Sequence, residues 1–128
     1  MELTSTLSEK DVMSVNALTL AYVGDAVHSL YVRNKLALSH DCKIDTLHRM
    51  ASDEVKASAQ AEFVERIFDQ LTEAEQSVYL RGRNSSAHHK AKNQLASDYR
   101  KATGFEAVLG YLYLTGQHDR LRDILELQ

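Results

Sequence analysis

Apolar residues recur every three or four positions along most of this chain, which is the spacing of one face of an α-helix. No alternating run of β-branched residues, the pattern of a half-buried strand, appears in the sequence. The 128 residues include no proline and only five glycines, so little in the chain would kink or break a long helix. We therefore predict an all-α fold, in which residues 1–128 form a single helical domain.

Cap residues and periodicity together divide the chain into helices. Gly24 is a candidate break in the first of them, and Thr72 and Glu75 form a Thr-x-x-Glu capping box. The stretch Arg81–Ser86 has the composition of a loop. The expected helical segments run from a Ser8 cap towards Leu36, from an Asp45 cap through Ile67, from Thr72 past Tyr79, from His88 to Lys101, from Thr103 to Leu114 near Gly116, and from Asp119 to Leu127.

The charge of the chain is unevenly distributed. The whole chain carries −3, but residues 81–101 hold six basic side chains and one acid, so this window is +5 and the remainder is −8. A polyanion would be attracted to this window and repelled elsewhere. The alternative is a solvated charged helix and loop, and charge alone does not decide between the two.

Asp25 stands where an amphipathic helix would normally place an apolar residue. It follows Tyr22 by three positions and Leu18 by seven, so it shares their helical face. Its neighbour Gly24 costs about 1 kcal/mol relative to alanine inside a helix. One interpretation is that Gly24 admits a second helix or a phosphate while Asp25 binds a cation. The other is that Gly24 begins a turn and Asp25 caps the next helix.

Glu106 is the second acid beside an apolar stripe. It borders Phe105, Val108 and Leu109, and Gly110 follows one turn later. Thr103 and Glu106 also fit a capping box, and a carboxylate in a first helical turn can be both held by a cap and directed at a metal. Mg²⁺ prefers hard oxygen ligands and keeps several waters, so one or two carboxylates with phosphate oxygens can hold it.

The amino-terminal residues and the hydropathy of the chain bear on its location. Residues 1–10 are polar and of mixed charge, unlike a secretion signal or a transit peptide. No apolar run approaches the roughly 18 residues that a membrane span requires. We therefore expect a cytoplasmic protein with no membrane partner.

Four motifs in this order resemble those of a known family. Residues 20–27, LAYVGDAV, resemble the signature helix of ribonuclease III enzymes, and residues 105–110, FEAVLG, resemble that family's second acidic helix. Other stretches resemble the Mini-ribonuclease III branch, which lacks a double-stranded-RNA-binding domain. They are RGRN at residues 81–84, and KN at residues 92–93 together with YRKATGFE at residues 99–106. The resemblance extends from about Val15 to about Leu125.

The resemblance implies a function and its residues. It implies a homodimeric, metal-dependent endoribonuclease that hydrolyses double-stranded RNA and matures the ends of large-subunit (23S) ribosomal RNA precursor, with a ribosomal protein as an assisting partner. Asp25 and Glu106 match the family's acids and would be both catalytic residues and ligands of Mg²⁺, for which Mn²⁺ can substitute. The residues expected to bind RNA are Arg81, Arg83, Asn84, Lys90, Lys92, Asn93 and Arg100.

The sequence also departs from the larger ribonuclease III enzymes. Leu18, Ala21 and Thr103 stand where those enzymes have acids, so two of the usual acidic positions remain. The number of metal ions at the site is therefore open. The missing acids also leave an alternative function open, that of a non-catalytic RNA-binding or ribosome-associated helical dimer.

Overall fold

A computed structural model describes residues 5–85 and 93–128, and within these residues every regular element is helical. The prediction of an all-α fold is therefore confirmed. In chain order the elements are α1 (Glu9–Met13), α2 (Ala17–Ser39), α3 (Ile44–Val55), α4 (Ala57–Ile67), the 3₁₀ turn η1 (Phe68–Gln70), α5 (Glu73–Ser85), α6 (Gln94–Leu114) and α7 (His118–Leu125).

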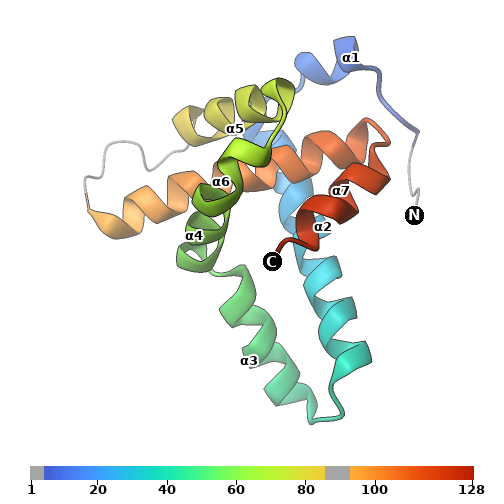
Figure 1. Cartoon of the computed structure of the whole chain (residues 1–128), viewed down its shortest axis with the longest axis vertical. Coiled ribbons are helices and arrows are strands. Elements are labelled where there is room, and N and C mark those ends of the chain that lie inside the picture. The colour runs from blue at the N-terminus through green and yellow to red at the C-terminus, as the bar shows by residue number, and fades with distance from the viewer. Residues whose placement is uncertain (1–4, 86–92) are drawn as a thin grey trace.

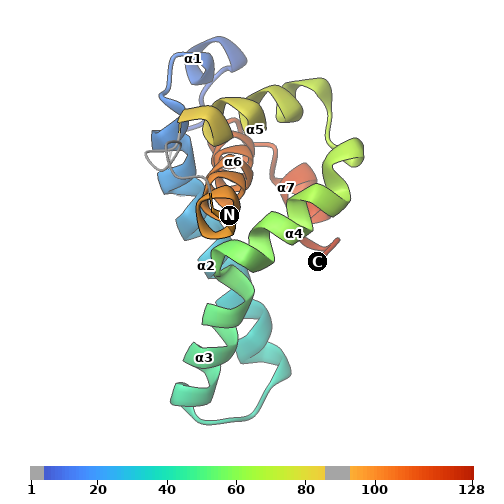
Figure 2. The ribbon, with the colours of Figure 1, turned by 90° about the vertical axis from the view of Figure 1, so that its left-hand side faces the viewer.

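Helix α6 is the centre of the molecule. Its second half is buried almost continuously from Ala102 to Leu112, as expected for a helix that is covered on all sides. It packs against α2, α4, α5 and α7, which surround it in both views (Figures 1 and 2). Phe105 is fully buried at this centre and meets the rings of Phe63 and His28 edge-on, with centroids 5.3 and 5.6 Å apart.

The second half of α2 and the whole of α3 project from this core as an antiparallel pair (Figure 1). Helix α3 has no buried residue, although its apolar side faces α2. Lys35 of α2 and Glu54 of α3 form a salt bridge of 2.9 Å across the pair. The projection is therefore stabilised by one thin interface rather than by the central core.

The first predicted helix is two helices, and its break is not at Gly24. Ser8 caps α1 as predicted, since its Oγ accepts a hydrogen bond from the Asp11 amide. The chain then turns at residues 14–16, where Asn16 Oδ1 accepts from the Leu18 amide and begins α2. Gly24 lies inside the uninterrupted α2, so the interpretation in which it begins a turn is wrong.

The second predicted segment is also divided. Helix α3 begins one residue before Asp45, with Lys43 at the cap position, so Asp45 lies in the first turn and does not cap the helix. Lys56 has extended backbone angles and separates α3 from α4. Periodicity did not reveal this break because the apolar spacing continues across it.

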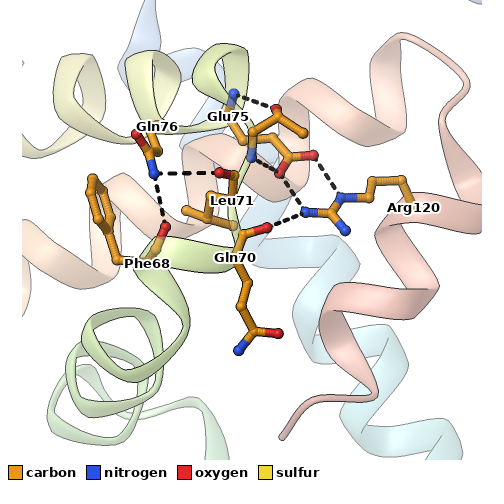
Figure 3. Close-up of polar contacts among 7 residues, drawn as sticks. Phe68, Gln70, Leu71, Glu75, Gln76 and Arg120 are labelled. Carbon is orange, nitrogen blue, oxygen red and sulfur yellow. Dashed lines mark hydrogen bonds and ion pairs between the residues drawn. The ribbon is translucent and has the colours of Figure 1, made fainter.

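The capping box at the start of α5 is confirmed. The Thr72 amide donates to Glu75 Oε1 and the Glu75 amide donates to Thr72 Oγ1, at 2.9 and 3.1 Å. Arg120 of α7 extends this box by donating to both Glu75 oxygens at 2.9 Å and to the Gln70 carbonyl at 2.8 Å (Figure 3). Burial would raise the pKa of Glu75, but the hydrogen bonds from Arg120 and Thr72 outweigh it and lower that pKa.

Two further predictions about helix boundaries are wrong. Residues 81–85 continue α5 instead of forming a loop, because Gly82 is a contact position: a Cβ there would meet Gly104 Cα and Ala107 Cβ at 2.9 Å. Thr103 does not begin a helix. It lies inside α6 and its hydroxyl donates to the Tyr99 carbonyl. Among residues 5–85 and 93–128, each helix is either too short or too polar to span a bilayer.

Candidate acidic site at the crossing of two helices

Helices α2 and α6 cross in direct backbone contact. A Cβ placed on Gly24 would lie 1.7 Å from the Glu106 carbonyl oxygen, and one placed on Gly110 would lie 1.9 Å from the Leu20 carbonyl oxygen. Only glycine at both positions permits this approach. The crossing confirms the interpretation that Gly24 admits a second helix.

This crossing brings Asp25 and Glu106 together. Asp25 follows the contact residue Gly24 on α2, Glu106 is itself the contact residue on α6, and both side chains line the same surface concavities. Asp25 is exposed and Glu106 is partly buried. Burial of the Glu106 carboxyl and the neighbouring Asp25 carboxyl raise the pKa of Glu106 to about 8. Burial and Asp25 thus favour a proton on Glu106 at neutral pH, and a divalent cation can displace that proton and stabilise both carboxylates.

The pair lies at the floor of an open hollow. Two adjoining concavities of about 290 and 270 Å³ share Asp25, Tyr99, Thr103 and Glu106 in their walls. Leu18, Ala21 and Tyr22 complete the first, and the second reaches Gln60 and Ala102. The hollow therefore gives a substrate access to both acids.

The donor set fits a hard divalent cation. It offers carboxylate oxygens from two helices and an amide side chain from a third, which are ligands that Mg²⁺ accepts. Among residues 5–85 and 93–128, no group of three or more His, Cys, Asp or Glu side chains is placed to hold a metal. This agrees with the sequence, in which Leu18, Ala21 and Thr103 stand where acids were expected from the resemblance. Any cation here would need water or substrate oxygens to complete its coordination.

Gln60 is a member of this site that the sequence analysis did not identify. It is 3% exposed on α4, and its Nε2 donates to the Val55 carbonyl oxygen at 2.6 Å and to Glu106 Oε2 at 3.3 Å. A signal was available, because Gln60 lies three residues before Phe63 and four before Val64, on the buried face of its helix. A buried amide in such a position needs partners, which makes it a candidate site residue.

The basic residues expected to contact RNA are placed at the end of α5 and the start of α6. Arg83 is half-buried, with its guanidinium 5.9 Å from the centre of the Tyr79 ring and its Nε 3.4 Å from Asn84 Oδ1. Asn84 is exposed. Arg100 is half-buried on α6, one residue beyond Tyr99 of the hollow. Lys90 and Lys92 lie outside the described residues.

Two of the residues that were expected to bind RNA make hydrogen bonds within the protein. Arg81 donates through Nη2 to the Val15 carbonyl oxygen at 3.1 Å, and its Nη1 is buried, so this side chain anchors α5 to the turn that precedes α2. The geometry favours this anchoring role over an RNA contact. Asn93 caps α6 by accepting from the Ala96 amide, while its side chain remains exposed.

Comparison with known proteins gives the same assignment as the motifs. Residues 18–117 match the ribonuclease III domain family. The chain is 46% identical to Mini-ribonuclease 3 of Thermoanaerobacter sp. over 99% of its own length and 89% of that protein's, and 44% identical to Mini-ribonuclease 3 of Enterococcus faecalis over 91% and 89%. A crystal structure of a Fusobacterium nucleatum protein superimposes with a TM-score of 0.79 at 26% identity, covering 91% of this chain and 93% of that one. The chain thus belongs to the ribonuclease III family of endoribonucleases, in its Mini-ribonuclease III branch.

Proposed function

We propose that this protein is a metal-dependent endoribonuclease that hydrolyses double-stranded RNA at the hollow between α2 and α6. The observation that supports this most strongly is the pairing of Asp25 and Glu106 at an accessible surface, on the motifs that match the family. A divalent cation that joins the two carboxyl groups stabilises the ionised form of both.

In this proposal Asp25 and Glu106 hold Mg²⁺, with Mn²⁺ able to replace it, beside the scissile phosphodiester. The bound ion would supply a water of lowered pKa and would neutralise negative charge in the transition state. The backbone contact at Gly24 holds α2 and α6 close together, so the backbone positions that carry Asp25 and Glu106 stay adjacent. Thr103, whose hydroxyl already donates to the Tyr99 carbonyl, lines the substrate side of the site.

RNA binding is assigned to the basic window that adjoins the hollow. Arg83, Asn84, Asn93 and Arg100 would contact phosphates and sugars, together with Lys90 and Lys92. Double-stranded RNA is recognised mostly through phosphates, 2′-hydroxyls and groove shape, which suits a positive window with few base-reading groups. One subunit offers few contacts, so we further propose a homodimer whose two-fold axis matches that of the duplex.

The branch suggests the biological setting. The substrate would be the base-paired ends of large-subunit (23S) ribosomal RNA precursor in the cytoplasm, with a ribosomal protein as a possible helper. Its test is the accumulation of unprocessed 23S precursor in cells that lack the protein, and restoration of the mature ends by the parent gene but not by Asp25→Asn.

The cleavage test compares the parent protein with Asp25→Asn and Glu106→Gln on a long RNA duplex in Mg²⁺. Asp53→Asn on the exposed surface of α3 is the matched control. Cleavage by the parent and the control, with losses of at least about a hundredfold in the two site variants, supports the proposal. Cleavage that is unchanged in either site variant contradicts it.

The alternative function, a non-catalytic RNA-binding or ribosome-associated dimer, is favoured by one observation. The described residues offer two acids and no larger metal-binding cluster. This alternative predicts salt-sensitive duplex binding without cleavage in Mg²⁺ or Mn²⁺.

A further inference from the structure

Gln60 carries a polar atom for which the described residues provide no partner. Its Oε1 is buried and makes no hydrogen bond in the structure, although the same side chain uses its Nε2 twice. A buried amide oxygen is normally satisfied by protein or by water. The Gln60 side chain lines the part of the hollow that also contains Asp25 and Glu106.

The orientation of the amide is fixed by its neighbours. The group at 2.6 Å is the Val55 carbonyl oxygen, and the group at 3.3 Å is a carboxylate oxygen of Glu106. The Val55 carbonyl oxygen can only accept, so the nitrogen must face it and the oxygen must point away. Because Val55 ends α3 and Gln60 lies in the first turn of α4, the side chain also joins the two helices beside the site.

We propose that Gln60 is a positioning residue of the metal site: its Nε2 holds Glu106 Oε2 in place, and its Oε1 accepts a hydrogen bond from a water on the divalent cation. This proposal rests on the proposed function, since it requires the cation between Asp25 and Glu106. It adds a third protein group, from α4, to the two acids on α2 and α6. Outer-shell partners of this kind typically change metal affinity by about 10- to 100-fold.

The test measures binding of Mn²⁺ to the protein without RNA, by the electron paramagnetic resonance signal of the free ion. Gln60→Met removes both hydrogen-bonding functions and keeps the length of the side chain. Gln76→Met is the matched control, because Gln76 also donates through Nε2 to two backbone carbonyls, those of Phe68 and Leu71 (Figure 3), and is remote from the acidic pair.

We expect Gln60→Met to weaken Mn²⁺ binding by at least about tenfold, while Gln76→Met leaves the dissociation constant unchanged. Thermal unfolding of both variants shows whether the loss exceeds what general destabilisation produces. Equal Mn²⁺ affinity in the parent and Gln60→Met overturns the role of Gln60 and leaves the proposed function intact. If the parent itself binds no Mn²⁺, the metal site fails and the role of Gln60 fails with it.

A second measurement uses the parent protein and so does not depend on how a variant folds. In a high-resolution crystal structure with Mn²⁺, a metal-bound water should lie about 2.6–3.2 Å from Gln60 Oε1. A Mn²⁺ ion at the acidic pair with no water at Oε1 overturns the proposal.

Discussion

A methyl group at Gly24 should separate α2 from α6 and disturb the acidic site. The added Cβ would lie 1.7 Å from the Glu106 carbonyl oxygen, where real contacts stay beyond 3.0 Å, so the backbones must part by about 1.3 Å. Overpacking typically costs about 1–3 kcal/mol, and here the obstacle is backbone that cannot rotate away. Alanine recovers about 1 kcal/mol of helix propensity. We expect a net loss of about 2 kcal/mol for Gly24→Ala.

The assay is urea unfolding of Gly24→Ala beside Gly82→Ala, followed by cleavage of duplex RNA under conditions where both are folded. Gly82 is the comparison because its added Cβ would meet Ala107 Cβ and Gly104 Cα at 2.9 Å, a much smaller overlap than the one at Gly24. Gly82→Ala should therefore cost less stability than Gly24→Ala. Displacing Glu106 by about 1 Å should also slow cleavage by roughly a hundredfold. A Gly24→Ala protein as stable as the parent would refute the close crossing of the helices.

Three further predictions concern the core, a buried charge and RNA binding. Phe105→Ala should lower the free energy of unfolding by about 3–5 kcal/mol, because the ring is fully buried between Phe63 and His28; a loss under about 1 kcal/mol in urea unfolding would contradict this packing. Glu75→Gln should cost about 1–3 kcal/mol at neutral pH. The folded-state pKa of Glu75 is lowered, so the contribution of Glu75 to the free energy of unfolding is complete above the ordinary value of 4.5. This contribution is lost as the pH falls through the folded-state pKa. Parallel curves of stability against pH for parent and variant would show that the Arg120 pair contributes nothing. Arg83→Ala should raise the RNA concentration that gives half the maximal rate, with little change in the rate at saturating RNA; loss of turnover at saturation would show that Arg83 acts in the chemical step.

The sequence predicted those features that depend on local spacing. The period of the apolar residues indicated helices throughout, and the Thr72–Glu75 box marked the start of α5. The motif around Gly24 and Asp25 and the motif around Glu106 identified two acids that the structure brings together. The helix and cap predictions succeeded because each rests on residues within one or two helical turns, whereas the two acids, far apart in sequence, were paired through the resemblance of their motifs to the ribonuclease III family.

Helix boundaries and the third member of the site depended on tertiary contacts. Gly82 was interpreted as a loop residue because composition does not distinguish a flexible glycine from one on which another helix packs. The Thr103–Glu106 spacing fits a cap, but the preceding residues continue the helix from Asn93. Gln60 lies 46 positions from Glu106, so no local pattern could pair them.

The Arg81 side chain shows that the net charge of a segment does not predict the contacts of a single residue. The +5 window correctly identified a basic segment, but it could not show that Arg81 is directed at the Val15 carbonyl oxygen rather than at a ligand. Net charge describes attraction over long distances, whereas the task of one guanidinium depends on its nearest acceptors.

We propose that Asp25 and Glu106 hold one divalent cation between α2 and α6. Crystals of the protein soaked in Mn²⁺ test it directly through the anomalous scattering of the ion. We expect a peak about 2.1 Å from a carboxylate oxygen of each residue, or joined to one of them through a single water, and its absence from crystals of Asp25→Asn. A peak that lies elsewhere, or one that persists unchanged in that variant, would contradict the claim.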